Sequence, residues 1–240
     1  MRLRTNIASA TLLDSLRKIM ANPAFDDFYL VGGTALALQR GHRISVDIDM
    51  FTDLQYGEMK TEEIKDALKA MFSYVENIER LDETSLVYSL FVGNNDDDCV
   101  KLDICYDEKP IFPLVNVDGI RMLSEKDIAA MKINAAAQDR QRKKDFWDIH
   151  DLLETYSIEN MVEFALKRFP WTLTLEQIID GFKRLPMLND YSEIRCLKGK
   201  YWEFVVEDLM EQILKLEGMV GRIRNEDVQV GKCATFSLLP

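Results

Sequence analysis

The chain has 240 residues, of which 47% are hydrophobic and 30% are charged. This balance is ordinary for a globular protein and excludes the collagen-like and disordered classes. The net charge of −11 argues against general attraction to nucleic acid, although local basic patches remain open. The length accommodates one large domain or two small ones.

The cysteines and the apolar runs bear on the cellular compartment. Four cysteines show neither a CxxC pair nor zinc-ligand spacing, so a disulfide framework and a structural zinc site are not expected. Asp14 precedes any sustained apolar stretch, which argues against a signal peptide. No run approaches the roughly 18 apolar residues of a membrane span. We therefore expect a cytoplasmic protein without a membrane partner.

The first part of the chain alternates short apolar runs with helical patterns. Apolar residues at helical spacing predict helices over about 12–20 and 64–72. A short apolar run at 28–31 predicts a buried strand, and Val46, Ile48 and Met50 alternate with polar residues as in a second strand. These elements indicate an α/β arrangement.

The pattern then changes twice. Residues 86–92 and 100–106 flank the sequence GNNDDD and predict an antiparallel hairpin, with Asp96, Asp97 and Asp98 in a solvated turn. From Ser124, followed three residues later by Asp127, the pattern is helical almost to the end. We predict an α/β (α+β) fold with an α/β part over 1–122 and a helical part over 123–240. The aromatic residues of the helical part are expected to pack in its core; they include Trp171, Tyr201 and Trp202.

The most informative strand carries two carboxylates. Side chains alternate along a strand, so Asp47 and Asp49 share one face, while Val46, Ile48 and Met50 point to the other. Two unpaired carboxylates on one face repel each other unless a cation lies between them. Magnesium prefers this ligand set, and no histidine or cysteine nearby suggests zinc.

A glycine-rich turn precedes the acidic strand. Gly32, Gly33 and Thr34 follow an apolar strand and open a helical segment. Glycines let the backbone approach an anion, and a helix N-terminus presents free amides, so the turn can seat a phosphate. It is neither a Walker A loop nor a dinucleotide fingerprint. Taken alone, it also fits a simple strand-to-helix turn.

A third carboxylate lies in the second strand of the hairpin. Asp103 stands between two apolar residues and shares its face with Lys101 and Cys105. If that strand lies beside the Asp47 to Asp49 strand, the three carboxylates converge on one or two metal ions. Alternatively, Asp103 is a solvent-facing residue of an amphipathic strand.

A later helical segment combines acidic and basic residues. Asp145 and Asp148 share one face, beside an apolar stripe. The densest basic cluster in the chain precedes them: Arg140, Arg142, Lys143 and Lys144. This cluster can hold a triphosphate or a nucleic-acid backbone, or can be a solvated helical face. For His42 and His150 we favour structural or phosphate contacts over base catalysis.

These segments together resemble a known family. The stretches GGTALAL, GHRISVDIDMF, KLDI, KINA and RKKDFWDIHDLL are similar to those of the abortive-infection toxin nucleotidyltransferases of AbiEii/AbiGii type, within the DNA polymerase beta superfamily. The matching stretches span residues 28 to 153. The resemblance implies a mixed-sheet nucleotidyltransferase core followed by a helical C-terminal domain that completes the cleft.

The resemblance also implies an activity. It implies an enzyme that transfers an NMP group from an NTP to an RNA or tRNA end or to a protein, with Mg²⁺ or alternatively Mn²⁺, in a toxin–antitoxin or phage-defence system with a cognate antitoxin. By position, Asp47 and Asp49 match the metal ligands and Gly33 and Thr34 match a Gly-Ser element. Lys132 matches the nucleotide-binding lysine. Asp145 matches the later catalytic aspartate, a role for which Asp148 competes.

The expected mechanism depends on positioning and charge neutralisation. Asp47 and Asp49 hold the metal, joined by Asp103. Either Asp103 or Asp145 orients or deprotonates the acceptor hydroxyl. The expected phosphate contacts are Gly32, Gly33, Thr34, Arg43 and Lys132, with Asp148 alongside. Two alternatives stay open: a non-catalytic nucleotide- or partner-binding module on the same fold, and an Asp-x-Asp sugar-nucleotide transferase.

Overall fold

A computed structural model of the chain describes residues 2–82 and 85–235, with side chains described as far as residue 218. Within these residues, seven strands form one sheet in the order β3-β4-β5-β2-β1-β7-β6. The strands are β1 (Tyr29–Leu30), β2 (Asp47–Thr52), β3 (Tyr74–Glu76), β4 (Val87–Gly93), β5 (Cys99–Tyr106), β6 (Val115–Val117) and β7 (Ile120–Met122). The pairs β2–β5 and β1–β7 are parallel and the other pairs are antiparallel, so the predicted mixed sheet is confirmed.

Helices precede, interrupt and follow the sheet. The α-helices are α1 (Ala10–Ala21), α2 (Gly32–Arg40), α3 (Thr61–Met71), α4 (Glu125–Ala137), α5 (Lys143–Leu152), α6 (Ile158–Arg168), α7 (Leu175–Lys183) and α8 (Trp202–Thr235). Short 3₁₀ turns are η1 (Thr5–Ile7), η2 (Pro23–Phe25), η3 (Ile78–Arg80) and η4 (Leu185–Met187). Strands β1 to β7 therefore all precede residue 123, and α4 to α8 follow it.

Local signals place several of these elements. The side chain of Ser9 accepts a hydrogen bond from the amide of Leu12 and caps α1, and Ser124 does the same for Asp127 at the start of α4. Gly41 ends α2 in the left-handed conformation, with φ of 68°. The predicted hairpin is confirmed as β4 and β5, and its turn holds the exposed Asp96 and Asp97.

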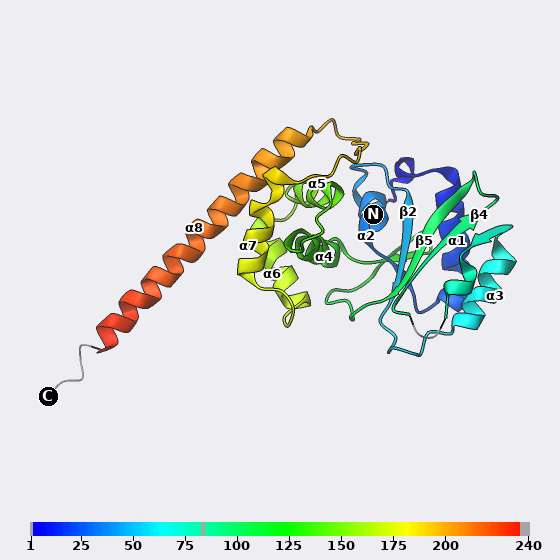
Figure 1. Cartoon of the computed structure of the whole chain (residues 1–240), viewed down its shortest axis with the longest axis horizontal. Helices are drawn as coiled ribbons and strands as arrows, with labels where there is room; N and C mark the ends of the chain where they lie inside the picture. The colour runs from blue at the N-terminus through cyan, green and yellow to red at the C-terminus, as the bar shows by residue number, and fades with distance from the viewer. Residues whose placement is uncertain (1, 83–84, 236–240) are drawn as a thin grey trace.

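The two faces of the sheet meet different partners. Helix α1 contacts β2, β4 and β5, and the central strands bury their apolar side chains, including Ile48, Met50 and Leu102. In Figure 1 the helices α4, α5, α6 and α7 lie on the opposite side of the sheet from α1 and α3. Because side chains alternate along a strand, the acidic residues of β2 and β5 face the helical part.

One hydrophobic core runs through both parts of the chain. It extends from Leu12 in α1 through Met122 in β7 to Phe146 in α5 and Leu216 in α8. The strand-bearing part and the helical part therefore share buried surface. A domain boundary between residues 122 and 123 stays a prediction.

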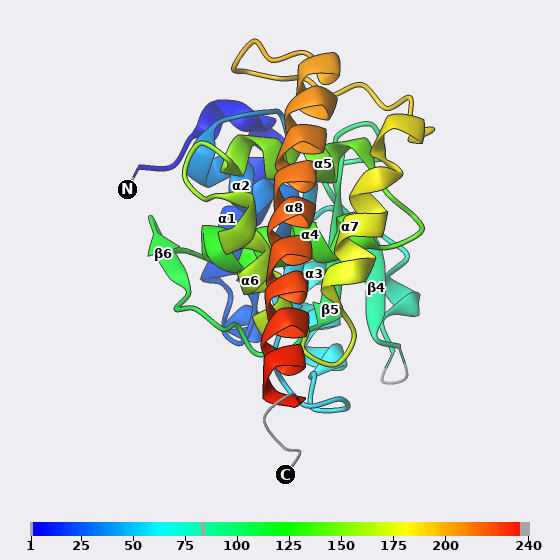
Figure 2. The ribbon, with the colours of Figure 1, turned by 90° about the vertical axis from the view of Figure 1, so that its left-hand side faces the viewer.

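Helix α8 begins against α5, α6 and α7 and then extends far beyond the body of the protein (Figure 1). In Figure 2 the same helix runs in front of the body. Its first turns bury Val205, Leu209 and Ile213. None of the described helices is both long enough and apolar enough to cross a membrane.

The expectation that the aromatic residues of the helical part are buried is only partly met. Trp202 is half-buried and stacks on Trp147, with ring centroids 6.1 Å apart. Trp171 is 92% exposed and Tyr201 is 67% exposed, so the prediction is wrong for both. Each lies in a connection between helices, and such segments run over the protein surface.

Candidate active site

The register of the sheet brings two predicted carboxylates side by side. Strands β2 and β5 run parallel, with Asp49 opposite Asp103 and Asp47 opposite Lys101. The predicted alternation of Asp47 and Asp49 with Ile48 and Met50 is confirmed. Val46 is 66% exposed instead of buried, because the strand begins one residue later.

Asp49 lies in an electrostatically unfavourable position. Burial raises the pKa of Asp49, and the negative charges of Asp103 and Asp47 raise it further. The positive charges of Lys132 and Lys144 only partly offset these effects. The negative charge of Asp49 is therefore not fully compensated by its neighbours.

Lysine side chains form ion pairs with the other two carboxylates, those of Asp103 and Asp47. Asp103 accepts a hydrogen bond from Ser89 Oγ at 2.6 Å and contacts Lys101 Nζ at 2.5 Å. Asp47 Oδ2 lies 3.6 Å from Lys144 Nζ. Among the described residues, no three His, Cys, Asp or Glu side chains are grouped so that they could hold a metal ion. Convergence of the carboxylates on a metal thus stays a prediction, and it requires Asp103 to exchange Lys101 for the ion.

The two glycines at the start of α2 are packed against functional side chains. Gly32 has φ of 67°, and a Cβ added there would lie 2.5 Å from Asp49 Oδ2. A Cβ on Gly33 would lie 2.3 Å from Arg43 Nη2. The glycines therefore provide room for two charged side chains, and Gly32 also lines the cavity in front of Asp49.

Replacing Gly32 with alanine is expected to destabilise the fold and to displace Asp49. The left-handed backbone costs an alanine about 1–2 kcal/mol, and the contact with Asp49 adds to this. Gly199→Ala is the matched control, because Gly199 also has φ of 67° but faces open space. In chemical denaturation both variants lose stability, and only Gly32→Ala also loses nucleotidyl transfer. Equal activity in the two variants would contradict this role of Gly32.

Thr34 ties the start of α2 to the start of β2. Its hydroxyl lies 2.8 Å from Ser45 Oγ and donates to the carbonyl oxygen of Asp47. The side chain is buried. Thr34 therefore positions the strand that carries Asp47 and Asp49, whereas its predicted phosphate contact stays a prediction.

A buried ion cluster connects α4 and α5 to the loop before β2. Lys132 Nζ lies 2.6 Å from Asp145 Oδ1 and 2.8 Å from Asp148 Oδ2. Arg43 donates to both oxygens of Asp148, from Nε at 2.6 Å and from Nη2 at 2.8 Å. His42 Nε2 lies 2.8 Å from Asp148 Oδ1. His42 is thus a buried structural contact, in line with its favoured interpretation.

Asp145 and Asp148 both belong to this cluster, but they differ in their position relative to the cavity. Burial alone would raise the pKa of Asp148, but the charges of Arg43 and Lys132 outweigh burial and hold it well below its usual range. For Asp145, too, the effect of burial is outweighed, here by Lys132 and Arg142, so its pKa is lowered. Asp145 lines the cavity, whereas Asp148 is fully buried and does not contribute to the cavity wall.

A cavity of about 280 Å³ lies between the sheet and α4. Its polar lining includes Gly32, Asp49, Asp103, Lys132, Arg142 and Asp145. Phe51 and Met131 form an apolar part of the wall that sequence reasoning missed, as it also missed the contact of Ser89 with Asp103. The hairpin register, which pairs Ser89 with Asp103, is the signal for that contact.

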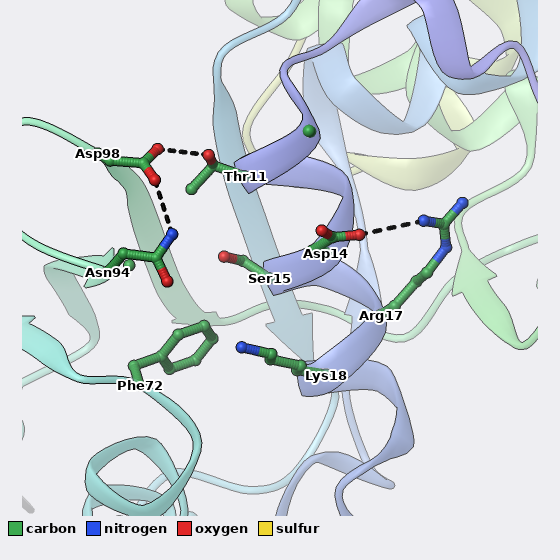
Figure 3. A pocket seen from close by; sticks show the side chains of 10 residues that line it. Thr11, Asp14, Ser15, Arg17, Lys18, Phe72, Asn94 and Asp98 are labelled. Atoms are coloured by element: carbon green, nitrogen blue, oxygen red, sulfur yellow. Dashed lines mark hydrogen bonds and ion pairs between the residues drawn. The ribbon is translucent and has the colours of Figure 1, made fainter.

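A larger hollow of about 540 Å³ lies elsewhere, between α1 and the β4–β5 turn (Figure 3). Asp98 accepts hydrogen bonds there from Thr11 and Asn94, and Lys18 Nζ lies 5.4 Å from the centre of the Phe72 ring. Its lining is separate from the carboxylates of β2 and β5. The smaller cavity is therefore the candidate active site.

Comparisons with known proteins identify the family of the chain. A protein-family model described as "Nucleotidyl transferase AbiEii toxin, Type IV TA system" matches residues 14–212. "Uncharacterized protein aq_aa25" of Aquifex aeolicus (strain VF5) is 29% identical over 179 residues, which cover 69% of this chain and 79% of that protein.

Two solved structures from Helicobacter pylori share the fold. JHP933 superposes with a TM-score of 0.59 at 18% identity, covering 95% of this chain and 99% of that one. A putative nucleotidyltransferase superposes with a TM-score of 0.58 at 18% identity, covering 92% and 99%. The family match extends over most of the chain and includes both acidic strands and the Lys132 cluster. The chain belongs to the AbiEii family of toxins of type IV toxin–antitoxin systems and is a nucleotidyltransferase.

Proposed function

We propose that the protein transfers an NMP group from an NTP to an acceptor hydroxyl, with a divalent metal bound by Asp47, Asp49 and Asp103. The observation that carries this proposal is the parallel register of β2 and β5, which sets Asp49 beside Asp103 at a cavity that Lys132 and Arg142 also line. Carboxylates on one side and Lys132 and Arg142 on the other suit a magnesium–triphosphate complex.

The donor set fits magnesium. The raised pKa of Asp49, which burial and neighbouring carboxylates cause, is the mark of a site that a cation would stabilise. Burial raises the pKa of the Cys105 thiol, which also lines the cavity, to about 12. The carboxylate oxygens of Asp49 and Asp103 in the same cavity are the ligands that magnesium prefers. When bound, Mg²⁺ would neutralise phosphate charge and polarise the phosphorus, and Mn²⁺ would accept the same oxygen ligands.

The cationic side chains divide between direct and indirect roles. Lys132 and Arg142 line the cavity and would contact the phosphates, together with the amides at the start of α2 near Gly32 and Gly33. Arg43 directs its guanidinium to Asp148, so its contribution is to position the Lys132 cluster. Asp148 would serve the same purpose.

The proposed reaction is a displacement at the α-phosphorus. The acceptor oxygen bonds to the α-phosphorus, the bond to the oxygen that bridges the α- and β-phosphates breaks, and pyrophosphate leaves with that electron pair. The hydroxyl proton passes to a carboxylate. The carboxylates at the cavity that could accept this proton are Asp103 and Asp145, and the pKa of Asp145 is lowered by Lys132 and Arg142.

Labelled NTPs, magnesium and candidate RNA and protein acceptors provide the test. Wild-type protein is expected to label an acceptor, and the Asp47→Asn/Asp49→Asn double variant is not. Equal labelling by both proteins would end the proposal. A thermal-shift comparison of NTPs with sugar nucleotides separates nucleotidyl transfer from sugar transfer, because only the bound substrate stabilises the fold.

The toxin family implies a partner in the cell. We propose that a cognate antitoxin counteracts this transfer. Expression of wild-type protein is expected to arrest growth, and expression of the double variant is not. If both proteins arrest growth, the toxicity does not depend on the carboxylates of Asp47 and Asp49.

A further inference from the structure

Lys101 is a cationic side chain that lies beside the carboxylates of the active site. It stands on β5 directly opposite Asp47 of β2, on the same face of the sheet as Asp49 and Asp103. Its Nζ lies 2.5 Å from Asp103 Oδ2, while Ser89 Oγ donates to the other oxygen, Oδ1, at 2.6 Å. The carboxylate that would have to accept a metal therefore already holds a cation.

We propose that Lys101 is a substrate-binding residue with two partners in turn. Its ammonium group pairs with Asp103 while no metal is bound, and it passes to the phosphates of the NTP when a divalent ion takes its place at Asp103. The inference rests on the proposed function and adds Lys101 to the residues of the same site. It is carried by the contact with Asp103, by the charges around Lys101 and by the exposure of its side chain.

The charges around Lys101 favour a cation at this position. Burial lowers the pKa of Lys101, but the hydrogen bond and the charge of Asp103, followed by the charges of Asp47 and Asp49, outweigh burial and raise it. A divalent ion among the same carboxylates would meet the same attraction and would be repelled by the ammonium group. The ion and Lys101 therefore compete for Asp103.

The side chain of Lys101 can change its partner, whereas that of Lys132 is held in place. Lys132 is buried between the carboxylates of Asp145 and Asp148. The Lys101 side chain is 37% exposed and pairs with Asp103, which lines the cavity. A lysine has a flexible four-carbon stem, and a partly exposed ion pair contributes little to stability. Lys101 can therefore leave Asp103 at a small cost.

The phosphates give the released ammonium group a new partner. In the proposed function the divalent ion binds together with the triphosphate, so negatively charged oxygens reach the carboxylates at the same time. Contacts between ammonium and phosphate are charge-assisted and strong. Magnesium without a nucleotide brings no such partner and has to break the contact of Lys101 with Asp103 uncompensated. We therefore expect Lys101 to oppose the binding of metal alone and to favour the binding of the NTP.

Isothermal titration calorimetry of the full chain with magnesium chloride, in the absence of nucleotide, measures the first effect. Lys101→Met keeps a long side chain and removes its charge. We expect this variant to bind magnesium about two- to fivefold more tightly than the wild type, because the ion pair no longer has to break. Lys101→Gln is a second variant, and the same shift is expected for it.

The affinity for a nucleotide is expected to change in the opposite direction. Non-hydrolysable analogues of ATP, GTP, CTP and UTP are each titrated in turn at saturating magnesium. Lys101→Met is expected to bind the analogue that the wild type prefers about 10- to 100-fold more weakly, the effect of losing one charged contact to a phosphate. An ion pair that only stabilises the sheet would not change the two affinities in opposite directions.

Lys65→Met is the matched control. Lys65 also pairs with a carboxylate, since its Nζ lies 2.7 Å from Glu62 Oε1. Both residues belong to α3, which lies on the opposite side of the sheet from the helical part (Figure 1). This variant is expected to bind magnesium and the analogues as the wild type does. Affinities of Lys101→Met equal to those of Lys65→Met would overturn the proposal.

Failure of this inference can be distinguished from failure of the proposed function. If the wild type binds magnesium and an analogue, but Lys101→Met shows neither shift or only one of the two, the role assigned to Lys101 alone is wrong. If the wild type binds neither magnesium nor any of the analogues, the proposed function fails.

Discussion

Asp49→Asn is expected to abolish nucleotidyl transfer and, in metal-free solution, to make the folded protein more stable. Metal-assisted charge neutralisation supplies several kcal/mol of transition-state stabilisation, and each 1.36 kcal/mol is tenfold in rate, so the loss is about a thousandfold or more. The gain in stability follows from the raised pKa of Asp49. Folding forces this carboxylate into a buried site beside Asp103 and Asp47, and a neutral amide removes that repulsion.

Thermal unfolding in the presence of a chelator measures the stability effect. Removal of about 1 kcal/mol of repulsion raises Tm by about 2–4 °C in a chain of this size. Asp96→Asn, the same substitution in the exposed β4–β5 turn, is the control and is expected to leave both activity and Tm unchanged. A lower Tm for Asp49→Asn without metal would show that Asp49 has a structural role in place of a ligand role.

Asp148→Asn is expected to cause the largest loss of stability. Asp148 is the shared partner of Arg43, Lys132 and His42, all of them buried. Removal of one partner from a buried ion cluster costs about 3–5 kcal/mol, because the remaining charges stay buried without compensation. At roughly 2–4 °C per kcal/mol, Tm falls by about 6–20 °C. Asp139→Asn, at a fully exposed carboxylate, is the control.

The pH dependence of stability gives an independent measurement of the same cluster. Because the folded pKa of Asp148 lies well below its usual range, its stabilisation is complete above the ordinary value of about 3.9 and is lost as pH falls through the folded value. Urea denaturation is therefore expected to show a steep acid loss in the wild type and a shallower one in Asp148→Asn. The same acid slope in both proteins would contradict the assignment.

The sequence alone predicts the features that depend on local periodicity. Alternation in β2 places Asp47 and Asp49 on one face, because the side-chain period of a strand is two. The hairpin of β4 and β5 follows from a turn rich in Asn and Asp. The Ser124 cap follows from short-range hydrogen bonding. The resemblance to the AbiEii family is confirmed by the match over residues 14–212.

Contacts between distant segments are beyond such reasoning. Asp148 meets both Lys132 and Arg43 only because α4 and α5 pack against α2, which no spacing along the chain encodes. The pairing of β2 with β5 could be stated only as a condition until the register was known. The exposure of Trp171 contradicts the usual burial of tryptophan, since a residue type indicates an average environment and not the position of a loop.

Anomalous diffraction from crystals that contain Mn²⁺ and a non-hydrolysable NTP tests the central claim most directly. We expect a manganese peak at ligand distance from the carboxylates of Asp49 and Asp103, with Asp47 beside it, the phosphates towards Lys132, and Lys101 released from Asp103. A manganese peak away from these carboxylates, or an NTP bound with the Lys101–Asp103 pair intact, would contradict it.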